Sequence, residues 1–357
     1  MSALQLRFHF GERDRDGDGP LHAAVMDACA RHGVWAAALL RGVEGFGSNA
    51  LVRTERFLSL SEDQPLVAVA VGEGEKVEAL AEEVKAIAAE GLMVLEEVGV
   101  WVGDAGLATT GTPTTTAAGV GVPVVGSAAE VAGDVVRATI WGPRTGAESP
   151  HLRAVDALYR HGAESATVLL GLDGVLDGER RRARFVAANR GVPAMTVAIG
   201  EREVIVEALA ELGALANLVT FEGVERSRRY ATERLHSGEG VARSSRIART
   251  SRHAARVTLL TSEATQCNGH PLYLEVLHAL RRAGAPGATA LRGVWGFRGD
   301  VAPHGDRVLA LRRDVPLLVE TVDSVERSER WLEIAESLAA GSDLVYCQGV
   351  RRRLVLD

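Results

Sequence analysis

Two hydrophobic periods alternate along the first hundred residues. Apolar residues occupy every second position from 4 to 10, which is the pattern of a half-buried β-strand. Pro20 suits the first turn of a helix, and an apolar stripe at helical spacing follows over residues 21–29. Gly33 is placed to end that helix. The start of the chain therefore predicts a strand followed by an amphipathic helix.

Three further strands and a second helix complete the pattern. Residues 36–40 and 66–69 are apolar runs of strand length, residues 77–87 carry a second helical stripe, and residues 92–98 form a closing strand. A loop is expected between the second and third strands. The order β-α-β-loop-β-α-β predicts an α+β fold of the ferredoxin-like βαββαβ type, with two helices on one face of an antiparallel sheet.

The same signals recur later in the chain. The sequence LRGVxGF stands at 40–46 and again at 291–297, and in both places its first glycine lies 22 residues after a Pro-Leu pair. Residues 169–176 hold a degenerate third version. The closing strand also occurs three times, beginning at Leu92, Leu218 and Leu344, each 126 residues after the one before. This ordered set of landmarks predicts three copies of one unit.

The repeat sets the expected domain boundaries. Repeats 1, 2 and 3 are expected at 1–103, 134–225 and 255–357, with repeat 2 degenerate. A Gly/Thr/Ala-rich linker at 104–133 and an Arg/Ser-rich linker at 226–254 separate them. A sheet covered by helices on one face needs a partner for the other face. We therefore expect the three sheets to pack around a pseudo-threefold axis, so that one chain forms an intramolecular pseudo-trimer and is a monomer in solution.

Composition narrows the function classes. The net charge of −7 argues against a general nucleic-acid binder. The three cysteines form no spaced pair, which argues against a disulfide framework or a zinc site and favours a reducing cytoplasm. No apolar run is long enough to span a bilayer. No nucleophile elbow, Walker-type loop or other catalytic constellation is found, so we expect no enzyme, no metal and no cofactor.

The stretches FHFGE at 8–12, GPL at 19–21, LRGVEGFG at 40–47 and LSEDQP at 60–65 together resemble the PII-like family known as domain of unknown function 190. Repeat 3 matches in altered form, and repeat 2 matches mainly in pattern. The resemblance implies a trimeric PII-like signalling fold that binds small ligands, such as adenine nucleotides, in clefts between subunits. It also implies that the loop after the second strand reports the ligand to a partner, such as a channel, transporter or enzyme.

The glycine-rich motif is the first candidate for a ligand site. Glycines allow backbone N–H groups to approach an anion, arginine can hold a phosphate, and phenylalanine can stack on a base. The alternative is that the glycines shape a turn and the phenylalanine fills an interface. The candidate residues are Arg41, Gly42, Gly45, Phe46 and Gly47 in repeat 1, and Arg292, Gly293, Gly296 and Phe297 in repeat 3. In repeat 2, Leu170 and Asp173 replace the arginine and the residue before the second glycine, so fewer than three sites are expected.

Glu12 and Glu263 occupy equivalent places, eight residues before Pro20 and Pro271. Each carboxylate could accept a hydrogen bond from a ribose hydroxyl or an adenine amine, or it could cap the turn into the helix. Two functions stay open from sequence. One is a sensor of a small anionic ligand that controls a partner protein, and the other is a ligand-free structural or adaptor platform.

Overall fold

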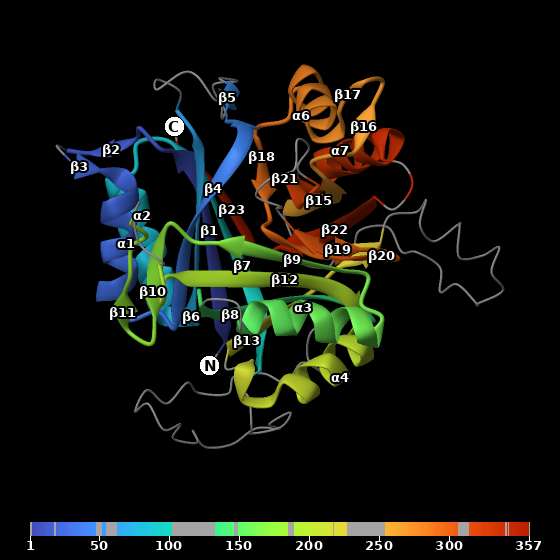
Figure 1. The fold of residues 1–357 in the computed structure, drawn as a ribbon. Coiled ribbons are helices and arrows are strands. Elements are labelled where there is room, and N and C mark those ends of the chain that lie inside the picture. The colour runs from blue at the N-terminus through green and yellow to red at the C-terminus, as the bar shows by residue number, and fades with distance from the viewer. Residues whose placement is uncertain are drawn as a thin grey trace.

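The computed structural model describes most of the chain (Figure 1). Its described residues are 2–17, 19–47, 52–54, 63–101, 133–145, 149–184, 189–216, 218–226, 254–305, 314–339, 341 and 343–356. Most of both predicted linkers lies outside these ranges. None of the helices in the described ranges combines the length and the apolar character needed to cross a membrane.

Repeat 1 has the predicted order of elements. Its strands and helices are β1 (Ala3–Gly11), β2 (Arg15–Asp16), β3 (Gly19–Pro20), α1 (Leu21–Arg31), β4 (Ala36–Phe46), β5 (Val52–Thr54), β6 (Pro65–Glu73), α2 (Gly74–Ile87) and β7 (Gly91–Trp101). The main strands lie in the antiparallel order β4-β6-β1-β7. Helix α1 follows Pro20 and stops before Gly33, whose φ of +62° suits glycine. The α+β prediction is confirmed for this unit.

Repeats 2 and 3 have the same strand order. Repeat 2 consists of β8 (Val135–Pro143), α3 (Pro150–His161), β9 (Ser165–Leu170), β10 (Asp173–Leu176), β11 (Glu179–Arg180), β12 (Pro193–Glu201), α4 (Arg202–Leu212), the short 3₁₀ helix η2 (Gly213–Leu215), β13 (Leu218–Gly223) and β14 (Glu225–Arg226). Repeat 3 consists of β15 (Ala254–Ser262), β16 (Gln266–Cys267), β17 (His270–Pro271), α6 (Leu272–Arg282), β18 (Ala288–Arg292), β19 (Trp295–Arg298), β20 (Val301–Gly305), β21 (Pro316–Ser324), α7 (Val325–Leu338), β22 (Leu344–Val350) and β23 (Arg352–Leu356). Their antiparallel orders are β9-β12-β8-β13 and β18-β21-β15-β22.

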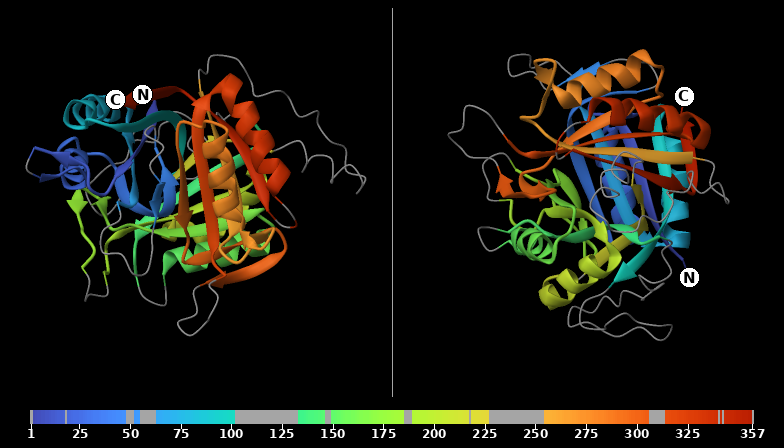
Figure 2. Two further views of the ribbon diagram at one scale, coloured as in Figure 1. Left: turned by 90° about the horizontal axis from the view of Figure 1, so that it is seen from above. Right: turned by 90° about the vertical axis from the view of Figure 1, so that its right-hand side faces the viewer.

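Two layers can be followed in each repeat. The paired helices lie on the outside, and the three sheets face one another in the interior (Figures 1 and 2). Each pair of helices packs on its own sheet over an apolar cluster. A further cluster unites the inner faces of all three sheets and includes Val69, Trp141, Val197 and Leu260. Both faces of each sheet are therefore buried.

The glycine-rich motif is a strand rather than the loop expected from sequence. Strand β4 continues through the whole motif to Phe46, and its second half leaves the sheet of repeat 1 to pair with β18 of repeat 3. Repeat 2 does the same with β10, which pairs with the first half of β4. Repeat 3 does so with β19, which pairs with β9 of repeat 2.

The three junctions are equivalent residue by residue. Phe46 lies opposite Ala288, Val175 opposite Ala37, and Phe297 opposite Ala166. Each of these pairs joins the last residue of the motif in one repeat to an alanine of another repeat, and the three alanines occupy equivalent positions, three residues before the motif begins. Repeat 1 thus pairs onto repeat 3, repeat 3 onto repeat 2, and repeat 2 onto repeat 1.

Close backbone approach explains a glycine at each junction. A Cβ added at Gly45, Gly174 or Gly296 would lie 2.8, 2.1 or 2.1 Å from a carbonyl oxygen of the strand opposite. Real Cβ atoms do not come so close to a backbone oxygen, and a glycine in a strand often marks such an approach. These glycines are therefore a requirement of the inter-repeat seam, which is why repeat 2 keeps its glycine although the rest of its motif has diverged.

The closing strands form a second set of junctions. Gly99 of β7 lies opposite Phe221 of β13, and Glu225 of β14 lies opposite Cys347 of β22. Gly99 and Glu225 are 126 residues apart, as are Phe221 and Cys347, and this is the repeat period found in the sequence. Strand β23 completes the set by pairing with β7.

A buried ionic network lies where the three sheets meet. Each repeat supplies one arginine and one glutamate, and their side chains are at most 2% exposed: Arg7 and Glu96, Arg137 and Glu222, Arg256 and Glu320. Most of the contacts cross between repeats, as in the 2.9 Å hydrogen bond that Arg256 Nη2 donates to Glu222 Oε2. Gln5 and Gln348 also belong to the network, because their side-chain amides donate hydrogen bonds to its glutamates.

Replacing Gly174 with alanine should force β10 away from β4. The new Cβ would collide with the carbonyl oxygen of Ala37, and such overpacking costs about 1–3 kcal/mol or more. Differential scanning calorimetry should show a clear fall in melting temperature. Gly47→Ala is the matched control, because nothing lies within 4 Å of its would-be Cβ. Equal melting temperatures for the two variants would contradict the seam assignment.

Replacing Glu222 with glutamine should leave two buried guanidinium groups short of a countercharge. Breaking one member of a buried ion pair typically costs about 3–5 kcal/mol. Glu211 pairs with Arg160 at the exposed surface, and Glu211→Gln should therefore lower stability far less than Glu222→Gln. Urea unfolding of both variants measures the difference, and similar losses in the two would show that the network contributes little.

Candidate functional site

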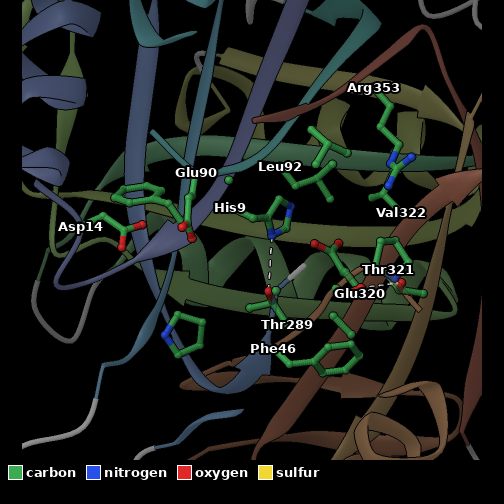
Figure 3. A pocket seen from close by; sticks show the side chains of 18 residues that line it. His9, Asp14, Phe46, Glu90, Leu92, Thr289, Glu320, Thr321, Val322 and Arg353 are labelled. Atoms are coloured by element: carbon green, nitrogen blue, oxygen red, sulfur yellow. Dashed lines mark hydrogen bonds between the residues drawn. The ribbon is translucent and has the colours of Figure 1, made fainter. Parts of the chain in front are cut away.

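A cleft opens at the boundary between repeats 1 and 3 (Figure 3). Its open volume, mouth included, is about 840 Å³. Space for the centres of water molecules amounts to about 80 Å³, several times the roughly 10–15 Å³ that one water needs. The walls come from β1, the end of β4, the start of β7, β18, β21 and β23. Such a cleft can hold part of a small molecule while the rest of that molecule lies in the mouth of the cleft.

His9 of β1 points into this cleft from the repeat 1 side (Figure 3). Its Nδ1 lies 3.4 Å from Oγ1 of Thr289, and its buried Nε2 has no hydrogen-bond partner. Burial, helped by the nearby positive charge of Arg7, lowers the pKa of His9 to about 4. The ring is therefore neutral at pH 7, and its Nε2 is buried without a partner beside the cleft.

Glu320 lines the cleft from the repeat 3 side and also belongs to the ionic network. It accepts a hydrogen bond of 3.1 Å from Arg7 and one of 2.8 Å from Arg137. Burial alone would raise the pKa of Glu320, but Arg7, Arg137 and Arg256 outweigh burial and hold it well below its usual range. The carboxylate is therefore ionised, and it connects the cleft to the centre of the molecule.

The cleft carries more negative than positive groups. Its lining includes three acidic residues, Asp14, Glu90 and Glu320, and a single arginine, Arg353 on β23. Arg353 lies 3.6 Å from Asp323, and its buried Nε has no hydrogen-bond partner. The rest of the lining is largely apolar and includes Phe46. An anionic group would therefore find its one cation at the β23 wall.

The other two boundaries carry apolar residues at the equivalent positions. The nine-residue strands β1, β8 and β15 each pair end to end with the third strand of their own repeat, which fixes the correspondence. His9 then corresponds to Trp141 and Leu260, and both are buried in the central apolar cluster. Glu320 corresponds to Val69 and Val197 in the same cluster. The polar cleft is thus a feature of the repeat 1–repeat 3 boundary.

The predicted site residues fall into four groups, the last of which consists of the arginines and glutamates. Phe46 and Gly47 line the cleft, although most of the Phe46 side chain is buried in the apolar cluster of repeat 3. Gly42, Gly45, Gly293 and Gly296 lie in the inter-repeat seams, where an added Cβ would clash. Phe297 is buried in the cluster of repeat 2, with its ring against Tyr159. The alternative in which the phenylalanines fill an interface therefore describes their main contacts.

The predicted arginines and glutamates bind one another. Arg41 donates to Glu12, and Arg292 Nη2 donates to Glu263 Oε1 at 2.7 Å. Neither arginine lines the cleft. The role of these four residues in ligand binding stays a prediction. Within the described residues, no cluster of His, Cys, Asp and Glu is arranged to hold a metal ion.

Sequence reasoning missed His9, Thr289, Glu320 and Arg353. The period-two pattern of the first strand predicts which residues alternate but assigns no role to the polar ones, whereas in the structure Gln5, Arg7 and His9 face the centre of the molecule. A glutamate in the middle of the apolar run PLLVETV at 316–322 is the signal that could have identified the site. A charge so placed needs a buried partner.

Comparison with known proteins identifies the two better-preserved repeats. The sequence model of the DUF190 family, described as uncharacterized ACR, matches residues 3–100 and 254–352. The chain belongs to the DUF190 family. A UPF0166 protein of Aquifex aeolicus (strain VF5) is 31% identical over 75 residues, which cover 21% of this chain and 71% of that protein.

One solved structure, described as an anthrone oxidase-like protein, aligns with 100% of this chain and 94% of its own at 8% identity. Its TM-score is 0.16, too low to bear on the fold. The two family matches coincide with the two repeats that form the cleft.

Acid should destabilise the DUF190 protein through its buried histidines. His151 is buried, its Nδ1 lies 2.8 Å from Thr196 Oγ1, and burial lowers its pKa to about 4. The unfolded chain takes up a proton near pH 6.5 and the folded chain only near pH 4, so this contribution is complete above pH 6.5 and declines toward pH 4. His9 behaves alike.

The loss is on the order of 3 kcal/mol for each histidine. The free energy of unfolding, measured with urea from pH 7 down to pH 4, should therefore fall less steeply for His151→Gln than for the natural protein. Parallel pH curves would show that His151 is not held neutral.

Proposed function

We propose that this DUF190 protein is a PII-like sensor in which one chain forms a pseudo-trimer and binds a small ligand in the cleft between repeats 1 and 3. The supporting observation is the cleft itself, which His9, Thr289 and Arg353 line between largely apolar walls. The matching seam registers support the pseudo-trimer, since three equivalent junctions require an approximate threefold relation. We further propose a cytoplasmic protein that controls a partner such as a transporter or enzyme.

The ligand we propose combines an apolar or aromatic part with one anionic group. Phe46, Leu92 and Val322 offer apolar contact area inside the cleft, and Arg353 offers the countercharge at its wall. An adenine nucleotide is the first compound to test. With one guanidinium against three carboxylates, the cleft favours a ligand of low negative charge over a polyphosphate.

The platform alternative rests on a different observation. Arg41 and Arg292 already bind Glu12 and Glu263, so the predicted anion-holding arginines are neutralised. A protein whose motif serves only to join its repeats would need no ligand. The experiment below separates the two functions.

A bulky residue at the cleft should abolish ligand binding. Val355 on β23 is 39% exposed and lines the cleft, whereas Val301 is 37% exposed and does not. A thermal-shift screen against adenine nucleotides, cyclic nucleotides, bicarbonate and fluoride should give a selective shift. A ligand at a hundred times its Kd adds about 2.7 kcal/mol.

Val355→Trp should remove that shift and Val301→Trp should keep it. Equal shifts in both variants would place the ligand elsewhere. No shift with any compound in the natural protein would favour the platform.

A further inference from the structure

Asp323 connects the cleft with a helix on the outside of repeat 3. It stands on β21, directly after Thr321 and Val322 of the cleft lining, and its side chain is 2% exposed. Arg353 lies on the cleft wall with its guanidinium group toward β21 (Figure 3), and its Nη1 is 3.6 Å from Asp323 Oδ1. The buried carboxylate of Asp323 is therefore the countercharge of the arginine in the cleft lining.

The other side chains that contact Asp323 belong to helix α7. Trp331 Nε1 donates a hydrogen bond of 3.0 Å to Oδ2, and Arg327 Nε lies 3.3 Å from the same oxygen. The backbone N–H of Ser324 donates to Oδ1 at 2.8 Å. A buried carboxylate depends on such partners, so the loss of one strengthens its interaction with the others. Arg353, Arg327 and Trp331 thus share one acceptor.

This arrangement is confined to repeat 3. The strand pairings and the helices that follow fix the positions equivalent to Asp323 and Trp331 in the other repeats. Those positions hold small or apolar residues: Gly72 and Leu80 in repeat 1, and Gly200 and Ala208 in repeat 2. The fold of the repeat therefore does not require the carboxylate or the indole. They occur only in the repeat whose closing strand forms a wall of the cleft.

We propose that Asp323 transmits the occupancy of the cleft to the N-terminal half of α7. This inference rests on the proposed function, in which an anionic group of the ligand binds Arg353. An anion that draws Arg353 away leaves Asp323 with fewer partners, so the carboxylate binds Trp331 and Arg327 more strongly. The guanidinium carbons of Arg327 and Arg330 lie 5.4 and 5.6 Å from the centre of the Trp331 ring, and both arginines are exposed. The change therefore reaches the surface of the molecule.

The indole N–H of Trp331 gives a direct readout in proton–nitrogen magnetic resonance spectra of the full chain, where Trp331→Phe assigns its resonance. Arg353→Gln removes the charge at the cleft wall without any ligand. The indole proton of Trp331 should then move downfield, because its hydrogen bond to Asp323 becomes stronger. Arg352→Gln is the matched control, since Arg352 lies on the same strand but pairs with Glu82 of α2.

Inorganic phosphate serves as the anionic probe, added to the natural protein at constant ionic strength. It should move the Trp331 resonance in the same direction as Arg353→Gln does. Asp323→Asn should abolish this response, because the neutral amide no longer couples the arginine to the indole.

Three results would overturn the inference and leave the proposed cleft in place. They are a Trp331 resonance that does not move in Arg353→Gln, one that moves as far in Arg352→Gln, and a phosphate response that persists in Asp323→Asn. If Arg353→Gln moved Trp331 while phosphate moved no resonance of the cleft residues, the coupling through Asp323 would stand and the anion site of the proposed function would fall.

Discussion

The structure depends on the buried ionic network at the centre of the three sheets. Moving six charges away from water is costly, and the cost is offset only when every charge finds its partners. Here each repeat contributes one arginine and one glutamate, and the closest pairs join different repeats, as Arg7 with Glu320 and Arg256 with Glu222. No repeat can satisfy these groups by itself in the observed arrangement. The network therefore makes the three sheets mutually dependent.

Covalent fusion explains how the network and the cleft became asymmetric. At the position of Arg137 and Arg256 repeat 1 has Gln5, and at the position of Glu96 and Glu222 repeat 3 has Gln348. The additional pair of Arg7 and Glu320 restores the balance. Because Glu320 also lines the cleft, the residue that completes the network gives one boundary its polar character. Three identical chains could not confine such a pair to one of three boundaries.

Sequence patterns predicted the elements well because they depend on local chemistry. The period-two alternation of β1, the stripe of α1 and the stop at Gly33 follow from backbone geometry and burial within one repeat. The path of the glycine motif could not be obtained in this way. Gly42 and Gly45 are needed because strand β18, which is far away in the sequence, lies against them, and no local pattern records that contact. The same holds for Gln5, Arg7 and His9, whose polar side chains resemble a solvent face until the other repeats bury them.

The mass of the purified protein in solution tests the central claim most directly. We propose that one chain supplies all three sheets around the network, so the particle needs no second copy. Light scattering over a wide range of concentrations should then give a mass close to the 37.8 kDa of a single chain. A stable particle of about three times that mass would contradict the account, because it would mean that the repeats complete their sheets with other chains.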